Sequence, residues 1–99
     1  MSFCVYVLHS EKLNRFYIGY TSNFEQRLDF HRTSASHKFT YSGGDWREFL
    51  KIECKSKLQA IKIESHIKKM KSKIYIHNLR RYPEMQEKLL KKYDQSSPR

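Results

Sequence analysis

The sequence has few cysteines, prolines and glycines, and no long hydrophobic run. Cys4 and Cys54 are the only cysteines and stand far apart, without the spacing of a zinc site or a disulfide framework, so we expect both to be reduced and buried. No apolar stretch approaches the roughly 20 residues of a membrane helix. The side chains of the N-terminal segment alternate as in a β-strand, and the segment does not resemble a charged, cleavable leader. These absences favour a cytoplasmic protein without a membrane segment.

Acidic residues are scarce as well. Ten Asp and Glu stand against twenty Lys and Arg, and the net charge of +10 favours a polyanionic partner, of which nucleic acid is the first candidate. The 99 residues suit one compact core, and the 38% hydrophobic and 14% aromatic content is sufficient to build it. We therefore expect one domain over residues 1–93 and a polar tail over residues 94–99.

Two apolar segments near the N-terminus predict a β-hairpin. Residues 3–8 and 16–21 are rich in β-branched and aromatic side chains, and a polar connection separates them. Both faces of each strand carry apolar groups, so helices should cover the sheet on both sides. Residues 46–54 alternate with a period of two and predict a third strand. Its apolar face is expected to carry Trp46, Leu50, Ile52 and Cys54.

A helix is predicted between the second and third strands. Ser22 and Glu25 have the spacing of a capping box, in which each side chain satisfies a backbone donor at the start of a helix. The helix should run over about residues 23–32. Residues 33–45 are rich in Ser, Thr and Gly, and they predict a loop that crosses to the third strand.

The C-terminal half is predicted to be helical. A long helix should extend from residue 57 to about residue 71, and two shorter helices should follow, the second of them opened by Pro83. Lysines fill most of the long helix outside one apolar stripe. That stripe, which should pack on the sheet, consists of Ala60, Ile63, Ile67 and Met70.

The predicted hairpin carries two short motifs. Cys4-Val5-Tyr6 lies on its first strand and Tyr17-Ile18-Gly19 on its second. With these two motifs the chain resembles the GIY-YIG nuclease family. It looks like a small single-domain member that is similar to the N-terminal nuclease domain of a bacterial excision-repair subunit. The resemblance covers roughly residues 3–80. The family order continues through Thr21, Arg27, Leu28, His31, Glu64 and Lys68.

The resemblance implies a fold and an activity. The fold is α/β, a small three-stranded sheet flanked by helices in the order ββαβα with a C-terminal helix. The activity is that of a metal-dependent endonuclease that hydrolyses phosphodiester bonds in DNA, in repair or recombination, with one divalent ion, Mg²⁺ or Mn²⁺, held by Glu64. Such chemistry is suited to phosphate hydrolysis, which has to activate water and offset growing negative charge. The implied catalytic residues are Tyr6, Tyr17, Arg27, His31 and Glu64, with Gly19 and Lys68 binding substrate.

Glu64 is the only acidic residue between Lys55 and Lys73. A helical wheel places it at the border of the apolar stripe, where its carboxylate can reach a cleft while the helix still packs. The structural alternative is an i,i+4 ion pair with Lys68, which would stabilise the helix by only about 0.2–0.5 kcal/mol. The motif order favours the metal-binding interpretation.

Arg27 and His31 lie one turn apart on the first predicted helix, on the side that carries its apolar anchors. Arginine can form paired hydrogen bonds to phosphate oxygens, and histidine can exchange a proton near neutral pH. The alternative for both residues is a solvated helix surface.

Tyrosines on strands are commonly core residues with their hydroxyls at the rim. A catalytic role requires nearby cations, because an ordinary tyrosine has a pKa near about 10. We assign the base to Tyr6 and the positioning of water or phosphate to Tyr17. Gly19 is explained equally by a strand bulge and by a close backbone approach.

Two positions depart from the family pattern. Cys4 stands where the family name has glycine, and Tyr20 stands where several members carry lysine. The alternative function is therefore a basic nucleic-acid-binding module that keeps the fold without cutting. The chain is too short to hold a separate DNA-binding domain, so recognition should depend on DNA shape or on a partner protein.

Overall fold

The computed structural model describes residues 2–33 and 45–94, with the side chains of residues 31–33 outside the description. Nearly all of the predicted loop over residues 33–45, and the tail beyond residue 94, therefore lie outside the described residues. Within the described ranges, no helix has the length and apolar character to cross a membrane. The elements are β1 (Phe3–Ser10), β2 (Arg15–Thr21), α1 (Phe24–Thr33), β3 (Arg47–Cys54), α2 (Lys57–Met70), α3 (Lys73–Arg81) and α4 (Pro83–Lys92).

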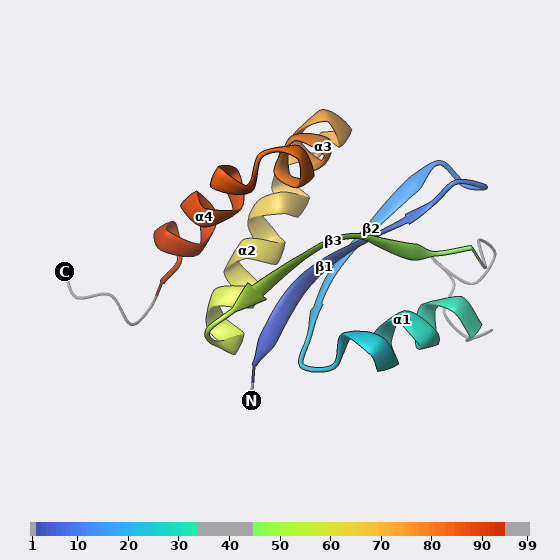
Figure 1. Ribbon diagram of the computed structural model, residues 1–99, viewed down its shortest axis with the longest axis horizontal. Helices are drawn as coiled ribbons and strands as arrows, with labels where there is room; N and C mark the ends of the chain where they lie inside the picture. Colours follow the sequence, from blue (N-terminus) through green and yellow to red (C-terminus); the bar gives the residue numbers. More distant parts are fainter. Residues whose placement is uncertain (1, 34–44, 95–99) are drawn as a thin grey trace.

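The three strands form one antiparallel sheet in the order β2-β1-β3. The predicted hairpin, third strand and helices are thus all present, and the α/β fold class is confirmed. Helix α1 covers one face of the sheet, and α2, α3 and α4 lie on the other (Figure 1). β1 is buried between its two neighbours, whereas β2 and β3 each have one free edge among the residues that the structure describes.

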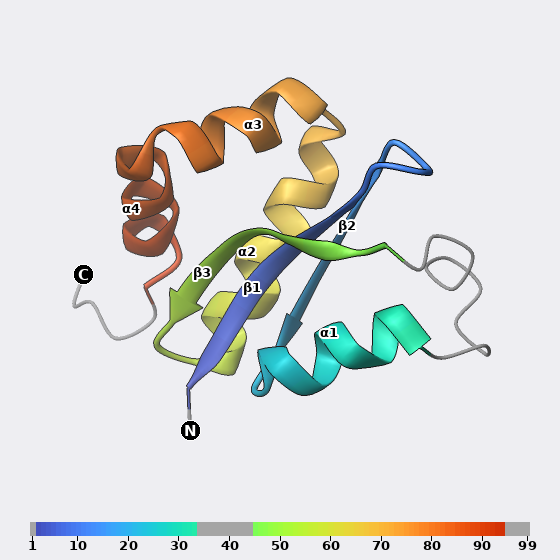
Figure 2. The ribbon, with the colours of Figure 1, turned by 45° about the vertical axis from the view of Figure 1, so that its right-hand side comes forward.

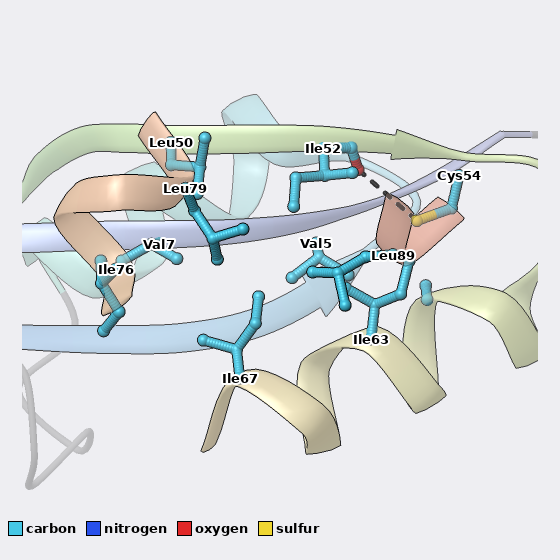
Figure 3. Packing of buried hydrophobic residues seen from close by; sticks show 11 residues of the cluster. Val5, Val7, Leu50, Ile52, Cys54, Ile63, Ile67, Ile76, Leu79 and Leu89 are labelled. Atoms are coloured by element: carbon cyan, nitrogen blue, oxygen red, sulfur yellow. Dashed lines mark hydrogen bonds between the residues drawn. The ribbon is translucent and has the colours of Figure 1, made fainter. Parts of the chain in front are cut away.

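The larger core lies between the sheet and α2 (Figure 3). Val5 and Val7 of β1 contribute to it, as do Ile63 and Ile67 of α2, and all four are at most 1% exposed. The prediction for Met70 is wrong, because its side chain is 45% exposed at the last residue of α2. The buried stripe of α2 therefore ends at Ile67, about one turn earlier.

Gln59 is the buried polar residue of α2. Its Oε1 accepts a hydrogen bond from the Lys55 amide at 2.6 Å, and its Nε2 donates to the Leu90 carbonyl at 2.9 Å. The side chain therefore ties α2 to the end of β3 and to α4, and satisfies backbone groups that would otherwise be buried without partners.

Trp46 lies on the opposite face from the one predicted. It packs with Tyr6, Leu8 and Phe24 on the α1 side, whereas Leu50 belongs to the core on the α2 side. The β1–β3 register shifts between Val7 and Leu8. One extra residue in β3 reverses the alternation there, because a slip of one residue moves every side chain to the other face.

The start of α1 also differs from the prediction. Asn23 caps the helix, with its Oδ1 accepting a hydrogen bond from the Gln26 amide at 3.1 Å. The Thr21 hydroxyl oxygen in turn accepts a hydrogen bond from the Asn23 amide at 3.0 Å. The capping box of Ser22 and Glu25 is therefore wrong by one residue, because α1 begins at Phe24. Asparagine is as good an N-cap as serine, so spacing alone did not separate them.

His66 joins the three helices on the α2 side of the sheet. Its Nδ1 lies 3.1 Å from the Tyr93 hydroxyl and its Nε2 3.1 Å from the Tyr75 hydroxyl. Burial lowers the pKa of His66, and the ammonium groups of Lys92 and Lys69 lower it further. The neutral imidazole is thus the form that this arrangement favours.

We expect acidification to destabilise the protein through His66. Its folded pKa lies below the unfolded value, so the unfolded chain takes up the proton first as the pH falls through about 6.5. The free energy of unfolding should therefore fall more between pH 7.5 and pH 5.5 for the wild type than for His66→Gln, measured by urea denaturation. The remaining histidines are common to both proteins, so an equal fall in the two would contradict this role for His66.

Candidate active site at the edge of β2

A cavity of about 380 Å³ opens beside the free edge of β2. Helices α1 and α2 lie on opposite sides of the sheet (Figure 2), and each contributes side chains to this cavity. Five of the seven residues predicted from the sequence line it: Tyr6, Tyr17, Gly19, Arg27 and Glu64. The rest of the lining consists of Phe3, Tyr20, Thr21, Ser22 and Lys57.

Tyr6 reaches the cavity by lying across its neighbouring strand. Tyr6 and Gly19 face each other in the β1–β2 register. A Cβ atom added to Gly19 would lie 2.5 Å from the Tyr6 hydroxyl oxygen and 2.7 Å from Cζ. Only glycine therefore leaves room for the distal part of the ring, and the group that lies against Gly19 is the Tyr6 side chain, which neither sequence interpretation had named.

Two aromatic neighbours fix the ring of Tyr6. The Tyr17 ring stacks on it at a centroid distance of 6.3 Å, and the Phe24 ring meets it edge-on at 5.8 Å. Tyr6 is only 2% exposed, whereas Tyr17 is half-buried. The two tyrosines are thus held as a pair, with Tyr6 the inner and Tyr17 the outer member.

The Tyr6 hydroxyl has an unusual electrostatic environment. Burial, followed by the Tyr17 hydroxyl, raises the pKa of Tyr6 well above its usual value, and the Glu64 carboxylate also raises it. The Arg27 guanidinium acts in the opposite direction and lowers this pKa. Tyr6 is therefore a neutral hydroxyl at pH 7, and it would have to gain a further positive neighbour in order to ionise.

Arg27 lies in the first turn of α1 and lines the cavity with an exposed side chain. Its guanidinium stands 5.8 Å from the centre of the Phe30 ring. The helix is held by Phe24, which is buried, and by the half-buried Leu28. This packing directs Arg27 toward the tyrosine pair and leaves its charge accessible to an anion.

Glu64 faces the cavity from the middle of α2. Its side chain is 17% exposed, and its Oε2 lies 3.4 Å from Nζ of Lys68. The carboxylate therefore lines the cavity and also forms the i,i+4 ion pair with Lys68. Lys68 itself lies outside this cavity and lines the two hollows beyond it.

Lys57 was missed by the sequence reasoning. It lines the cavity from the first turn of α2. The spacing of seven residues between Lys57 and Glu64 is about two helical turns, so a shared face was the available signal. His31 belongs to α1, but its side chain lies outside the described residues.

The donor set of the cavity suits one kind of metal ion. Within residues 2–33 and 45–94, no group of three or more His, Cys, Asp or Glu side chains could hold a metal. Glu64 is the only carboxylate among the described residues that line the cavity. Mg²⁺ commonly binds through one or two carboxylates and takes its other ligands from water and phosphate. A single glutamate in an open cavity is compatible with this mode of Mg²⁺ coordination.

Comparison with known proteins agrees with this geometry. The model of the GIY-YIG catalytic domain matches residues 2–81, which is most of the chain. Comparison with curated proteins and with solved structures gave no match. The chain belongs to the GIY-YIG family, and its domain is thus of a nuclease type whose members generally depend on a divalent metal ion. The match supports the family as a whole and does not single out the excision-repair subunit.

Proposed function

We propose that the protein is a metal-dependent DNA endonuclease that hydrolyses phosphodiester bonds in the cavity beside β2. One observation carries the proposal: Tyr6, Arg27 and Glu64, which come from three different elements, line the same cavity. The net charge of +10 supports a polyanionic substrate. The family supports nuclease chemistry, and a role in DNA repair or recombination is part of the proposal.

Arg27 is the residue that contacts the phosphate being cleaved. Its guanidinium is always charged and offers paired hydrogen bonds to phosphate oxygens. Its accessibility at the cavity suits this role, since a buried arginine would have to leave its partners to meet the substrate. Stabilisation of the growing negative charge by such a group is a large part of phosphoryl-transfer catalysis.

The tyrosine pair handles the attacking water. Tyr17, the more exposed member, orients the water or the phosphate, and Tyr6 accepts the proton of the water once it has lost its own proton to solvent. Because the pKa of Tyr6 is raised, Tyr6 can act as a base only after added positive charge has lowered it. Arg27 supplies part of that positive charge, and the rest would have to come from the divalent ion.

Glu64 would hold the divalent ion, Mg²⁺ or Mn²⁺. When bound, the ion supplies positive charge that lowers the pKa of nearby water or hydroxyl groups and offsets the charge on phosphate. A Glu64 carboxylate that held the metal would give up its ion pair with Lys68, and the Lys68 ammonium would then be available to DNA. His31, as a catalytic group that can donate or accept a proton, and Lys68, as a residue that binds the substrate, complete the proposed set.

Cleavage of supercoiled plasmid tests the proposal. We expect the wild type to nick DNA with Mg²⁺ or Mn²⁺ but not with EDTA. Arg27→Ala should reduce the rate about 100-fold or more, and Arg27→Lys should recover only part of it, because lysine keeps the charge and loses the paired geometry. Full cleavage activity of Arg27→Ala would contradict the proposed contact between Arg27 and the phosphate that is cleaved.

A non-catalytic nucleic-acid-binding module is the second candidate. It is favoured by the ion pair that occupies the Glu64 carboxylate and by the neutral state of Tyr6. This candidate predicts salt-sensitive DNA binding without cleavage under either metal. Co-purification of a partner protein that restores cleavage would instead identify a subunit whose substrate recognition comes from that partner.

A further inference from the structure

Two further hollows continue from the cavity along β2. The first, of about 280 Å³, shares Tyr17 with the cavity. The second, of about 310 Å³, shares Arg15, Phe16, Ile18 and Lys68 with the first and extends to the turn between α2 and α3. We call these two hollows the β2 furrow.

The floor of the furrow is apolar and its rim is basic. Phe16 and Ile18, which are half-buried, provide aromatic and aliphatic surface, and the buried Ile67 and Ile76 lie at its base. Arg15, Lys68, Lys71 and Lys73 stand around it, and no acidic residue lines either hollow among the described residues. A rim of one charge around an apolar floor fits a ligand that carries anionic groups beside flat apolar ones.

The backbone positions of the rim at the turn between α2 and α3 are set by the fold. Lys71 follows the last turn of α2 in the left-handed conformation, with φ of 48°. Lys73 donates to the carbonyl of Asn14 at 2.9 Å and so fastens the start of α3 to the turn of the hairpin. The positive end of the α3 dipole, capped by Ser72, lies at the same hollow. The furrow is thus a formed part of the fold.

We propose that the β2 furrow binds a single-stranded segment of DNA that adjoins the phosphodiester bond in the cavity. Duplex DNA offers its phosphates and keeps its bases stacked inside, so it would leave the apolar floor uncovered. A single strand offers both, and proteins that bind single strands combine a positive groove with aromatic platforms for bases. The phosphates meet Arg15 and Lys71, and a base lies against Phe16.

This inference rests in part on the proposed function, because only a nuclease would have a bond to cut in the cavity. Binding of DNA in the furrow does not depend on cleavage. Binding is therefore measured in EDTA by fluorescence anisotropy, with a labelled blunt duplex and with the same duplex carrying a single-stranded overhang. The furrow variant is Arg15→Ala with Lys71→Ala. The matched control is Lys88→Ala with Lys91→Ala, two exposed lysines of α4 that line neither hollow.

We expect the furrow variant to lose about tenfold more affinity for the overhang DNA than for the blunt duplex. On single-stranded DNA, the slope of log K against log salt should decrease in magnitude by about 1.4, because two phosphate contacts are lost. The control variant should affect both DNAs alike. Phe16→Leu, which keeps an apolar side chain, should lower the preference for the overhang without changing the salt slope.

Equal losses on both DNAs, or equal effects of the furrow and control variants, would overturn the inference, because the rim would then act as unspecific charge. An unchanged overhang preference in Phe16→Leu would overturn the stacking of a base. A wild type that prefers the overhang but never cuts with Mg²⁺ or Mn²⁺ refutes the proposed function and leaves the furrow standing. Thermal melting of each variant checks that the fold is kept.

Discussion

Glu64→Gln is expected to reduce metal-dependent DNA cleavage about 100-fold or more, the order of effect seen when a single electrostatic group is removed from an active site. Glutamine keeps the size of the side chain and removes the charge of the only carboxylate that lines the cavity among the described residues. The free energy of unfolding should change by no more than about 0.5 kcal/mol, because the lost ion pair joins residues one turn apart at a partly exposed position.

Glu11→Gln is the matched control for this prediction. Glu11 also forms one ion pair, with its Oε1 3.0 Å from Arg47, but it lies at the turn of the hairpin and lines none of the three hollows of the site. Plasmid nicking under single-turnover conditions and urea denaturation are measured for both variants. Cleavage by Glu64→Gln at the rate of Glu11→Gln would show that the carboxylate holds no essential ion.

Gly19→Ala is expected to impair both folding and cleavage. The new methyl group would overlap the distal end of the Tyr6 ring, which is held by Tyr17 and Phe24 and cannot move without disturbing the pair. Overpacking of this kind costs about 1–3 kcal/mol of unfolding free energy. A shift of the Tyr6 hydroxyl by about 1 Å should lower the rate about 100-fold. Urea denaturation and plasmid nicking measure the two effects.

A double-mutant cycle isolates the contact between these residues. In a Tyr6→Leu background the atoms that the methyl group would overlap are gone. Gly19→Ala should then be neutral or stabilising by about 0.5–1 kcal/mol, as alanine is preferred to glycine within a strand. If Gly19→Ala destabilises both backgrounds by the same amount, the glycine serves backbone geometry instead of the ring of Tyr6.

The fold followed from the sequence more closely than the site did. Alternation, capping residues and helical periodicity are local signals, and they were enough for all three strands and for the helices. The errors lie where a distant contact decided the outcome. Trp46 changed faces because β3 slips by one residue against β1, and Met70 is exposed at the last residue of α2.

The site divides in the same way. The order of Tyr6, Tyr17, Arg27 and Glu64 could be taken from the chain through its resemblance to a family, and the structure brings these residues into one cavity. Lys57 and Arg15 carried no motif, because nothing local distinguishes one exposed cation from another in so basic a chain.

By itself, the sequence determined the elements and the basic charge, since both depend on side-chain type and short-range spacing, and its resemblance to a family named the residues proposed for the chemistry. Only the tertiary structure decided how they act together. Packing of Tyr6 across Gly19 buries the hydroxyl and raises its pKa, and the free edge of β2 leaves room for a cavity and a furrow. Burial and strand order arise from contacts between distant residues, and for that reason no local pattern encoded them.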